Sequence, residues 1–458
     1  MKRSEAQEIA LKIAGVERTQ VTQKINSYFD KSDLAKQIWE IQPYFYDKSK
    51  IWWLWNNEEK KWEMIDDTDI LNAVSELSTA NTVDSKDKNE IIESMKQFGR
   101  KKLPKPVKKT WVQFKGMVYD ILTGKAFKAT PEYFTTNPIP WALNKESCGT
   151  TPVIDRIFTE WVGEEFKETL YEIISYSLIP DYPIHRLFCL IGAGLNGKGC
   201  YLRLLEKFLG QDNLCSTELD TLLTSRFEVS RLHKKLLCVM GETNFSEMKK
   251  TSMLKKLSGG DLIGFEYKGK KHFEDYNYAK ILIATNNLPT TTDKTIGFYR
   301  RWLIIDFPNQ FDEAKDILSE IPDEEYEALA CKSVIVLSSL LSTRQFTNEG
   351  NIEERMKKYE DRSDPLEKFL KEFTQEDANK FIYKWDFEKR LNGWCKEHRF
   401  REIAENTIGK KMKDKGLEST QVSAEWYDKD TLIKRRVRAW SGLTWCEQVA
   451  QVTQVTST

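Results

Sequence analysis

The stretch Leu187–Cys200, LFCLIGAGLNGKGC, decides the expected fold of the chain. Its first five residues are apolar, as in a buried strand, and apolar residues at helical spacing follow from Tyr201 to Phe208. The glycine-rich turn between them lets the backbone pass close to an anion, and the amides of a helix N-terminus point toward that anion. The sequence therefore predicts a strand, a phosphate-binding loop and a helix, with Lys198 reaching nucleotide phosphates. A chance match in a core turn is the alternative.

The turn supplies the expected nucleotide contacts. They are Gly192, Gly194, Asn196, Gly197, Lys198, Gly199 and Cys200. The residue after the lysine departs from the usual phosphate-loop pattern, in which a Ser or Thr hydroxyl helps to hold Mg²⁺. Gly199 stands at that position, so ATP and Mg²⁺ are the expected ligands but the metal must be held in another way.

Composition bounds the possible classes of protein. The 458 residues are 40% hydrophobic, which is enough for about three folded domains. Because 70 Lys and Arg balance 70 Asp and Glu, nucleic-acid contacts must come from local patches. The eight cysteines and four histidines are dispersed without a C-x-x-C pair, which argues against zinc and favours a reduced, cytoplasmic protein. No apolar run of 18 residues and no signal peptide is present, so no membrane partner is expected.

Residues 1–110 are expected to form an N-terminal accessory domain with a Trp-rich sheet and a basic linker. Trp52, Trp53, Trp55 and Trp62 lie in short aromatic strands. They either pack in a core, which we favour, or offer stacking surfaces to single-stranded nucleic acid. Residues 100–128 hold nine Lys and Arg and one Asp. This segment is either a solvated linker or a strip that follows phosphates.

Further polar residues follow the other apolar strands. Glu242 ends the strand from Lys234 and is the expected catalytic carboxylate and metal ligand, although Gly241 stands where a second acid is common. A surface Glu without a catalytic role is the alternative. Asn286, after the strand 280–285, is placed to sense the γ-phosphate or the attacking water.

Two cationic motifs accompany these strands. Arg300 and Arg301 can stabilise transition-state charge, or they pair with surface acids. A glycine turn between two short strands predicts a hairpin that projects cations, which is either an ordinary loop or a grip on a phosphate backbone. Its expected DNA-binding residues are Lys268, Lys270, Lys271 and His272.

The order of these motifs resembles that of the superfamily 3 helicases, closest to the primase-helicases of phages, plasmids and poxviruses. The resemblance covers residues 110–310. It implies an α/β fold with a P-loop ATPase core of the AAA+ type, a helical collar before it, and a hexameric ring that translocates on single-stranded DNA. By position it makes Lys198 the phosphate contact, Glu242 the catalytic carboxylate, Asn286 the sensor, and Arg300 or Arg301 the finger reaching the neighbouring subunit. It also implies a virus or plasmid of a prokaryotic host, with a separate primase or polymerase as a further partner.

The C-terminal part predicts a winged-helix DNA-binding domain. Helices over 366–373, 385–398 and 403–415 precede a strand-rich end, and residues 380–438 carry sixteen Lys and Arg against ten Asp and Glu. The third helix holds the expected contacts to single- or double-stranded DNA, which are Lys410, Lys411, Lys413 and Lys415. A solvated helix face is the alternative.

Five segments result from this interpretation. They are 1–110, the accessory domain; 111–182, strands and helical collar; 183–345, the ATPase; 360–446, the winged helix; and 447–458, a disordered tail. The leading hypothesis is an ATP-dependent replicative DNA helicase without primase activity. The alternatives are an ATP-binding scaffold for DNA or an origin with little hydrolysis, favoured by Gly199 and Gly241, and, more weakly, a P-loop kinase.

Overall fold

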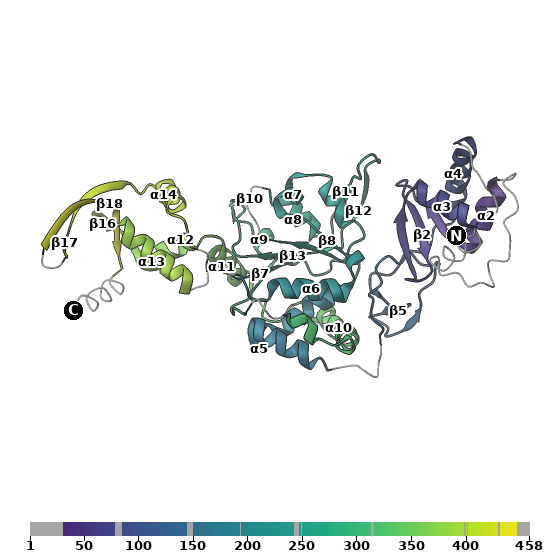
Figure 1. Ribbon diagram of the computed structural model, residues 1–458, viewed down its shortest axis with the longest axis horizontal. Coiled ribbons are helices and arrows are strands. Elements are labelled where there is room, and N and C mark those ends of the chain that lie inside the picture. The colour runs from purple at the N-terminus through teal and green to yellow at the C-terminus, as the bar shows by residue number, and fades with distance from the viewer. Residues whose placement is uncertain are drawn as a thin grey trace, which may run out of the picture.

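The computed structural model describes residues 31–77, 85–143, 150–192, 194–241, 247–248, 250–312, 316–397, 400, 402–428 and 431–446. Figure 1 shows an elongated molecule in which a central α/β unit separates the N-terminal elements, in purple and blue, from the C-terminal elements, in yellow-green. The central unit contains the glycine-rich loop, so its sheet positions the candidate site.

Five parallel strands form the central sheet. They are β7 (Leu187–Ile191), β8 (Leu214–Ser216), β9 (Leu237–Met240), β13 (Lys280–Thr285) and β15 (Trp302–Asp306), in the spatial order β15-β7-β13-β9-β8. The register sets Ile191 beside Thr285 on one side and Asp306 on the other. The carboxyl ends of three strands are therefore level, and the loops that leave them share one edge of the sheet, where α/β proteins bind ligands.

Helices cover both faces of this sheet. One face carries α5 (Pro152–Tyr176), α6 (Lys198–Leu209) and α10 (Asp323–Thr343); the other carries α7 (Leu219–Thr224), α8 (Ser252–Leu257), α9 (Ile296–Tyr299) and α11 (Ile352–Ser363). Phe188 and Leu190 of β7 pack under the first set, and Leu187, Cys189 and Ile191 under the second. The apolar run of β7 is thus buried on both faces, as is typical of a strand in a parallel sheet covered by helices. The expected parallel α/β arrangement is confirmed.

Short elements complete the central unit. They are β10 (Glu247–Met248), β11 (Leu262–Phe265), β12 (Phe273–Tyr276), β14 (Thr290–Thr291) and the 3₁₀ turns η2 (Gln211–Asn213), η3 (Glu228–Leu232) and η4 (Ile317–Glu320). Helix α5 changes direction at Gly163, whose φ of 79° and ψ of 169° are not helical. Helix α5 therefore consists of two halves that meet at Gly163.

Helix α10 packs against α5 in the main core. Among the described residues it is the one helix whose length and composition would let it cross a membrane, but half of its apolar window is buried inside the protein. That burial is typical of a core helix. Cys331 on α10 is disulfide-bonded, which corrects the expectation that all cysteines are reduced. The dispersed spacing of the cysteines gives no signal for this bond, because a disulfide depends on proximity in the fold.

The N-terminal part contains two small sheets. Around the first, β1 (Tyr44–Tyr46), β2 (Trp52–Asn56) and β3 (Lys61–Ile65), lie α2 (Lys31–Ile41), α3 (Asp67–Leu77) and α4 (Ser85–Gly99). The second consists of β4 (Trp111–Phe114), β5 (Met117–Asp120) and β6 (Ala126–Lys128). Helix α4 and the strands β4 to β6 show that the segment 85–128 contains regular structure and is not only a linker.

The four tryptophans of the first sheet are core residues, as favoured by the sequence. Trp52 packs on one face of the sheet with Tyr44 and the helices, and Trp53, Trp55 and Trp62 pack on the other. All four are almost fully buried. The second cluster also receives Tyr267 and Phe273 from the ends of β11 and β12, so the N-terminal sheet and this hairpin share a core.

The C-terminal unit has three helices and one antiparallel sheet. Its elements are α12 (Pro365–Phe373), β16 (Thr374–Tyr383), α13 (Lys384–Glu397), α14 (Glu405–Asp414), β17 (Ser419–Asp428) and β18 (Thr431–Trp445), with the sheet order β16-β18-β17. Asp364 caps α12 by accepting from the Glu367 amide, and Pro365 fits the first helical position. The three helices and the final strands were expected. Strand β16 was not, because a polar run from Gln375 to Lys380 hides its pattern.

A buried lysine ties the segment after α5 to the sheet. The Lys280 ammonium, on β13, donates to the Ile179 carbonyl oxygen and lies 5.0 Å from the centre of the Tyr176 ring. Burial lowers the pKa of Lys280 to about 7. An unfolded chain keeps the usual lysine pKa of about 10.4, so between these values the unfolded state binds a proton that the folded state does not.

We therefore expect the free energy of unfolding to rise with pH from 7.5 to 9.5 more in the wild type than in Lys280→Met. The gain should approach about 1.4 kcal/mol per pH unit. Urea unfolding of both proteins at both pH values measures it. Parallel curves would mean that Lys280 keeps its proton in the folded protein.

Candidate functional site

The glycine-rich loop has the backbone that the sequence predicts. It leaves β7 after Ile191 and enters α6 at Lys198, and Gly194 and Gly197 have φ values of 105° and 90°, where a side chain is strained. Gly197 is constrained a second time, since a Cβ there would lie 2.4 Å from Nε1 of Trp161. Trp161, on α5, thus fixes how closely the loop can approach the core, and no motif in the sequence marks it.

The Lys198 ammonium lies at the centre of the loop. It donates to the Gly192 carbonyl oxygen at 2.5 Å and to Oδ1 of Asn196 at 3.1 Å. Asn196 is held in turn by a bond from its amide to the Phe307 carbonyl oxygen, 3.4 Å away. Lys198 and Asn196 are both buried at the mouth of the loop, so a cation is fixed where an incoming phosphate would arrive.

The loop and the end of β13 form one cavity of about 790 Å³. The Gly192 amide donates to the Thr285 carbonyl oxygen at 3.4 Å, which places Asn286 next to the loop. The cavity residues are Glu160, Trp161, Gly194, Leu195, Asn196, Gly197, Lys198, Gly199, Cys200, Arg203, Asn286, Phe311, Asp312 and Ile317. The lining combines apolar side chains such as Leu195 and Phe311 with the Lys198 cation and the amide side chains of Asn196 and Asn286, a mixture that suits a nucleotide base and its phosphates.

The residue after Lys198 differs from the usual phosphate-loop pattern. A Cβ on Gly199 would meet no atom within 4 Å, so no steric constraint explains the absence of a Ser or Thr. Cys200 contacts Arg203, whose Nη2 is 3.3 Å from the sulfur atom. Glu242, the expected catalytic carboxylate and metal ligand, lies outside the described residues. Asp312 lines the cavity and is a carboxylate of the kind that Mg²⁺ prefers. Sequence reasoning missed it because it lies in an irregular segment after β15.

Arg300 and Arg301 occupy different environments. Arg301 is buried, with Nε 3.1 Å from Oγ of Ser258 and Nη2 3.2 Å from the Lys255 carbonyl oxygen. Burial and then the charge of Arg300 lower the pKa of Arg301. Arg300, at the end of α9, is exposed.

Both arginines lie at the amino end of the sheet, opposite the glycine-rich loop. Trp302 pairs with Leu187, the first residue of β7, whereas the loop follows Ile191, the last. A five-residue strand spans roughly 15 Å, so Arg300 is too far from the cavity of its own chain to contact a phosphate there.

The basic hairpin is present. Strands β11 and β12 pair in antiparallel register from Leu262 with Tyr276 to Phe265 with Phe273. Its tip residues Lys268, Lys270, Lys271 and His272 are all exposed. The base is braced by His233, whose Nδ1 is 2.9 Å from the Tyr267 hydroxyl and whose Nε2 is 3.2 Å from Asp275.

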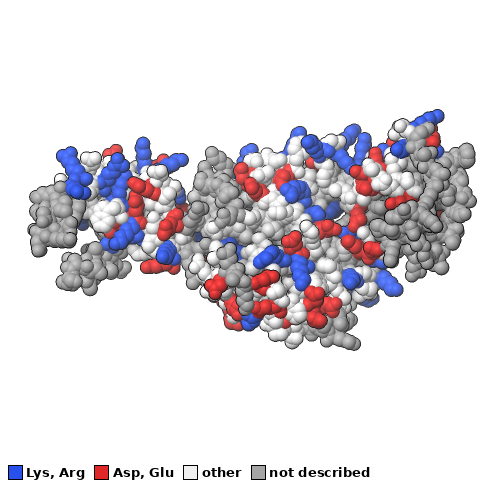
Figure 2. All heavy atoms as spheres, viewed as in Figure 1, with Lys and Arg blue, Asp and Glu red and all other residues white. Residues whose placement is uncertain are grey.

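The four lysines predicted on α14 separate into two pairs. Lys411 forms an ion pair with Asp364 at 2.9 Å, and Lys415 pairs with Glu367. These two therefore hold α14 against the start of α12. Lys410 and Lys413 are exposed and remain the DNA-binding candidates of this helix. Figure 2 shows Lys and Arg gathered over the C-terminal unit.

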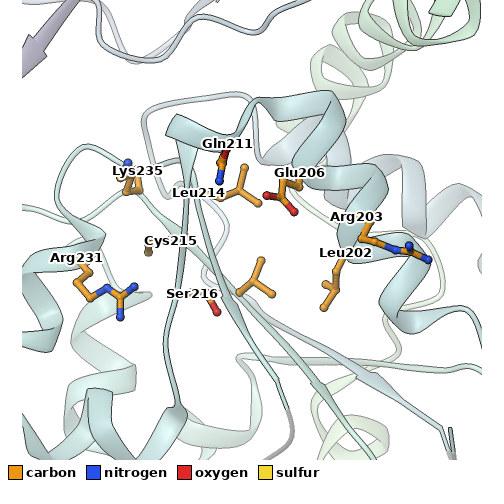
Figure 3. A pocket seen from close by; sticks show the side chains of 10 residues that line it. Leu202, Arg203, Glu206, Gln211, Leu214, Cys215, Ser216, Arg231 and Lys235 are labelled. Atoms are coloured by element: carbon orange, nitrogen blue, oxygen red, sulfur yellow. The ribbon is translucent and has the colours of Figure 1, made fainter. Parts of the chain in front are cut away.

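A second cavity, of about 510 Å³, lies beside β8. Figure 3 shows its lining, with Arg231 and Lys235 on the side of Cys215 and Glu206 across from them. Cys215 is the register partner of Cys238. A hydrogen bond from Cys238 and the charge of Lys235 lower the pKa of the Cys215 thiol. This site is separate from the glycine-rich loop.

Comparison with known proteins gives limited similarity. The profile of a family of unknown function (DUF5906) matches residues 190–301, from the loop strand to Arg301. Similar solved structures include two of the C-terminal region of NrS-1 in the apo form. One has a TM-score of 0.46 at 12% sequence identity, covering 90% of this chain and 99% of that chain. The other has a TM-score of 0.45 at 13% identity, covering 90% and 100%. These similarities assign no function.

The glycines of the loop allow a matched test. Gly197→Ala should strongly reduce binding of a fluorescent ATP analogue, because the added methyl group meets Trp161 and the φ of 90° is strained. Gly199→Ala should bind the analogue like wild type, since its Cβ enters open space. Fluorescence titration measures both, with thermal unfolding as the check on folding. Equal binding by the two variants would contradict the loop geometry.

Proposed function

We propose that this protein is an ATP-dependent, ring-forming replicative DNA helicase that translocates on single-stranded DNA. The central unit would be its AAA+ ATPase, the two halves of α5 its collar, and the C-terminal unit its winged-helix domain. One observation carries the proposal: Lys198 and Asn286 share a cavity, whereas the exposed Arg300 lies at the opposite end of the same sheet.

This separation is the reason to propose a ring. A cation that stabilises the transferred phosphoryl group must reach it, and Arg300 cannot reach the cavity of its own chain. In a closed head-to-tail ring, one end of each sheet faces the opposite end of its neighbour, so every Arg300 meets a cavity. Arg300 is the better candidate for this finger than Arg301, because Arg301 is bound to Ser258 and backbone carbonyl groups inside its own subunit.

Within the cavity, each residue would have a distinct task. Bound ATP would supply the phosphoryl group that is cleaved. Lys198 would neutralise phosphate charge, Asn286 would hold the attacking water or the γ-phosphate, and Glu242 is the residue proposed to accept a proton. Asp312 and Glu242 are the carboxylates proposed to hold Mg²⁺, replacing the hydroxyl that Gly199 lacks.

The basic hairpin supplies the proposed contact with DNA in the pore. Four cationic or potentially cationic side chains crowd the five-residue tip 268–272, which is exposed at the end of the paired strands β11 and β12. Cations projecting from every subunit of a ring would follow the phosphates of one strand without reading its sequence. The C-terminal unit supports a winged helix as a second DNA-binding element. Its elements follow one another along the chain as helix, strand, helix, helix and two strands.

The first test is ATP hydrolysis by wild type and Lys198→Ala, each with and without single-stranded DNA. We expect DNA-stimulated turnover in the wild type and its loss in the variant, because the cation at the phosphates is removed. Gly199→Ala is the matched control for folding of the loop. If the wild type binds ATP but hydrolyses none under any DNA condition, the helicase proposal falls.

That outcome would favour the second candidate, an ATP-binding scaffold on DNA. Its supporting observation is that a Cβ on Gly199 or Gly241 would meet no atom of the described residues within 4 Å. Packing therefore does not require glycine at either position. A site that does not need fast hydrolysis would tolerate the loss of metal-holding side chains there. In this case ATP would serve only to organise the ring.

Mixing subunits tests whether the site is shared. Arg300→Ala added in increasing proportion to wild type should depress ATP hydrolysis more than in proportion, because each variant subunit also disables its neighbour's site. Arg344→Ala, which removes another exposed arginine, is the control and should leave the activity unchanged. Strictly proportional loss with Arg300→Ala would refute the shared site.

A further inference from the structure

Two cysteines lie side by side in the central sheet. Cys215 of β8 is the register partner of Cys238 of β9, and the two strands run parallel. Neighbouring strands of a sheet lie about 4.8 Å apart, which is within the range of Cα separations that a disulfide bridges. Both residues are free cysteines. The backbone therefore holds two thiol-bearing residues at a distance that suits a covalent bond between them.

The two side chains lie on the same face of the sheet. Cys238 belongs to the core that contains Leu187 and Cys189 of β7, and Cys215 packs against that same core. Leu214, the residue before Cys215, packs against the core on the opposite face, as the alternation along a strand requires. The two thiols are hydrogen-bonded to each other. They thus face one another across the strand pair.

The two cysteines differ in their exposure. Cys238 is fully buried, whereas part of Cys215 remains exposed. Strand β8 is the last in the order of the sheet, so one of its edges has no partner strand among the described residues. The second cavity is lined by all of β8, from Leu214 to Ser216, with Arg231 and Lys235 on the side of Cys215 (Figure 3). A small solute that enters this cavity therefore meets Cys215 before Cys238.

The groups around Cys215 favour its thiolate form. The hydrogen bond from Cys238 and the charges of Lys235 and Arg231 lower the pKa of the Cys215 thiol, although its burial acts in the opposite direction. Glu228 also opposes the effect, but it forms an ion pair with Arg231 at 2.8 Å. The same hydrogen bond, together with burial, raises the pKa of the Cys238 thiol. One thiol is thus prepared for nucleophilic attack, while its neighbour keeps its proton.

We propose that Cys215 and Cys238 are a hydroperoxide-reactive thiol pair that closes to a reversible disulfide. The Cys215 thiolate attacks one oxygen of hydrogen peroxide, and the O–O bond breaks to give the Cys215 sulfenic acid and hydroxide. The Cys238 sulfur then attacks the sulfenic sulfur, the S–O bond breaks, and the Cys238 proton leaves with that oxygen as water. The hydroxide takes up the proton that Cys215 had released. Two thiols and one peroxide therefore yield one disulfide and two waters.

The exposed side of Cys215 also favours the reverse reaction. A reducing thiol must attack one sulfur of a disulfide, and exposed disulfides are reduced more readily than buried ones. The bond would therefore tie the edge strand β8 to β9 only while an oxidant prevails. This site goes beyond the proposed function, because its chemistry requires neither ATP nor DNA.

Peptide mapping of the full chain tests the thiol pair. Reduced protein is treated with hydrogen peroxide, the remaining thiols are blocked with N-ethylmaleimide in urea, and the chain is digested with trypsin without reductant. Cleavage after lysine and arginine places Cys215 in peptide 208–226 and Cys238 in peptide 236–249. We expect these two peptides to be linked, with the loss of two hydrogen atoms, and to separate after treatment with dithiothreitol.

Two variants assign the roles of the two thiols. In Cys238→Ala the link should be lost, and dimedone should label Cys215 as a sulfenic acid that no second thiol consumes. In Cys215→Ala the link should also be lost, and Cys238 should remain a free thiol because it stays protonated. Cys446→Ser removes another free cysteine that is partly exposed, and this matched control should form the link as the wild type does.

Three results would overturn the thiol pair. Unlinked peptides that carry N-ethylmaleimide on both cysteines after peroxide treatment would show that the two thiols only pack together. Dimedone labelling of Cys238 in Cys215→Ala would contradict the assigned roles. A link that appears as a dimer on a non-reducing gel would join two chains and not two strands of one sheet. Thermal unfolding of each reduced variant checks that a missing link does not reflect a lost fold.

Discussion

The register of the central sheet is the constraint on which the rest of the structure depends. It sets Ile191, Thr285 and Asp306 side by side at one edge, so the glycine-rich loop and Asn286 meet without any direct sequence link. A slip of one residue would turn every side chain of β7 from one core to the other. The two cores on the two faces of the sheet therefore fix the geometry of the cavity more firmly than the loop itself does.

The sequence predicts those parts whose chemistry is local. A five-residue apolar run followed by positive-φ glycines and Lys198 has few structural solutions, and the structure has the one expected. The hairpin was predictable for the same reason, since the turn Lys268–Lys271 lies between two short strands. The C-terminal helices have clear apolar spacing, and all three were found near their expected bounds. The parallel fold and the burial of the tryptophans are likewise confirmed.

What the sequence could not predict depends on contacts between distant segments. Arg300 and Arg301 are adjacent and chemically alike, and only the position of Ser258 shows that Arg301 is turned inward. Trp161 is indistinguishable from any apolar helix residue until Gly197 is found against its ring. Lys411 on α14 and Lys415 at its C-cap pair with Asp364 and Glu367 at the start of α12, and a helical wheel cannot show such pairs. The roles of Glu242, of the exposed arginine and of the DNA-binding cations stay predictions.

The shared core between the N-terminal sheet and the hairpin base limits what can move. Tyr267 and Phe273 are packed among Phe45, Trp53 and the other rings of that cluster, so tilting the hairpin as a whole would open a buried aromatic interface. Separating such a cluster is costly compared with bending a short glycine-containing turn. The N-terminal sheet therefore holds the base of the hairpin in place. Any displacement of the cationic tip is confined to the turn 268–272, and its range is set by the length of that turn and not by rotation of the strands beneath it.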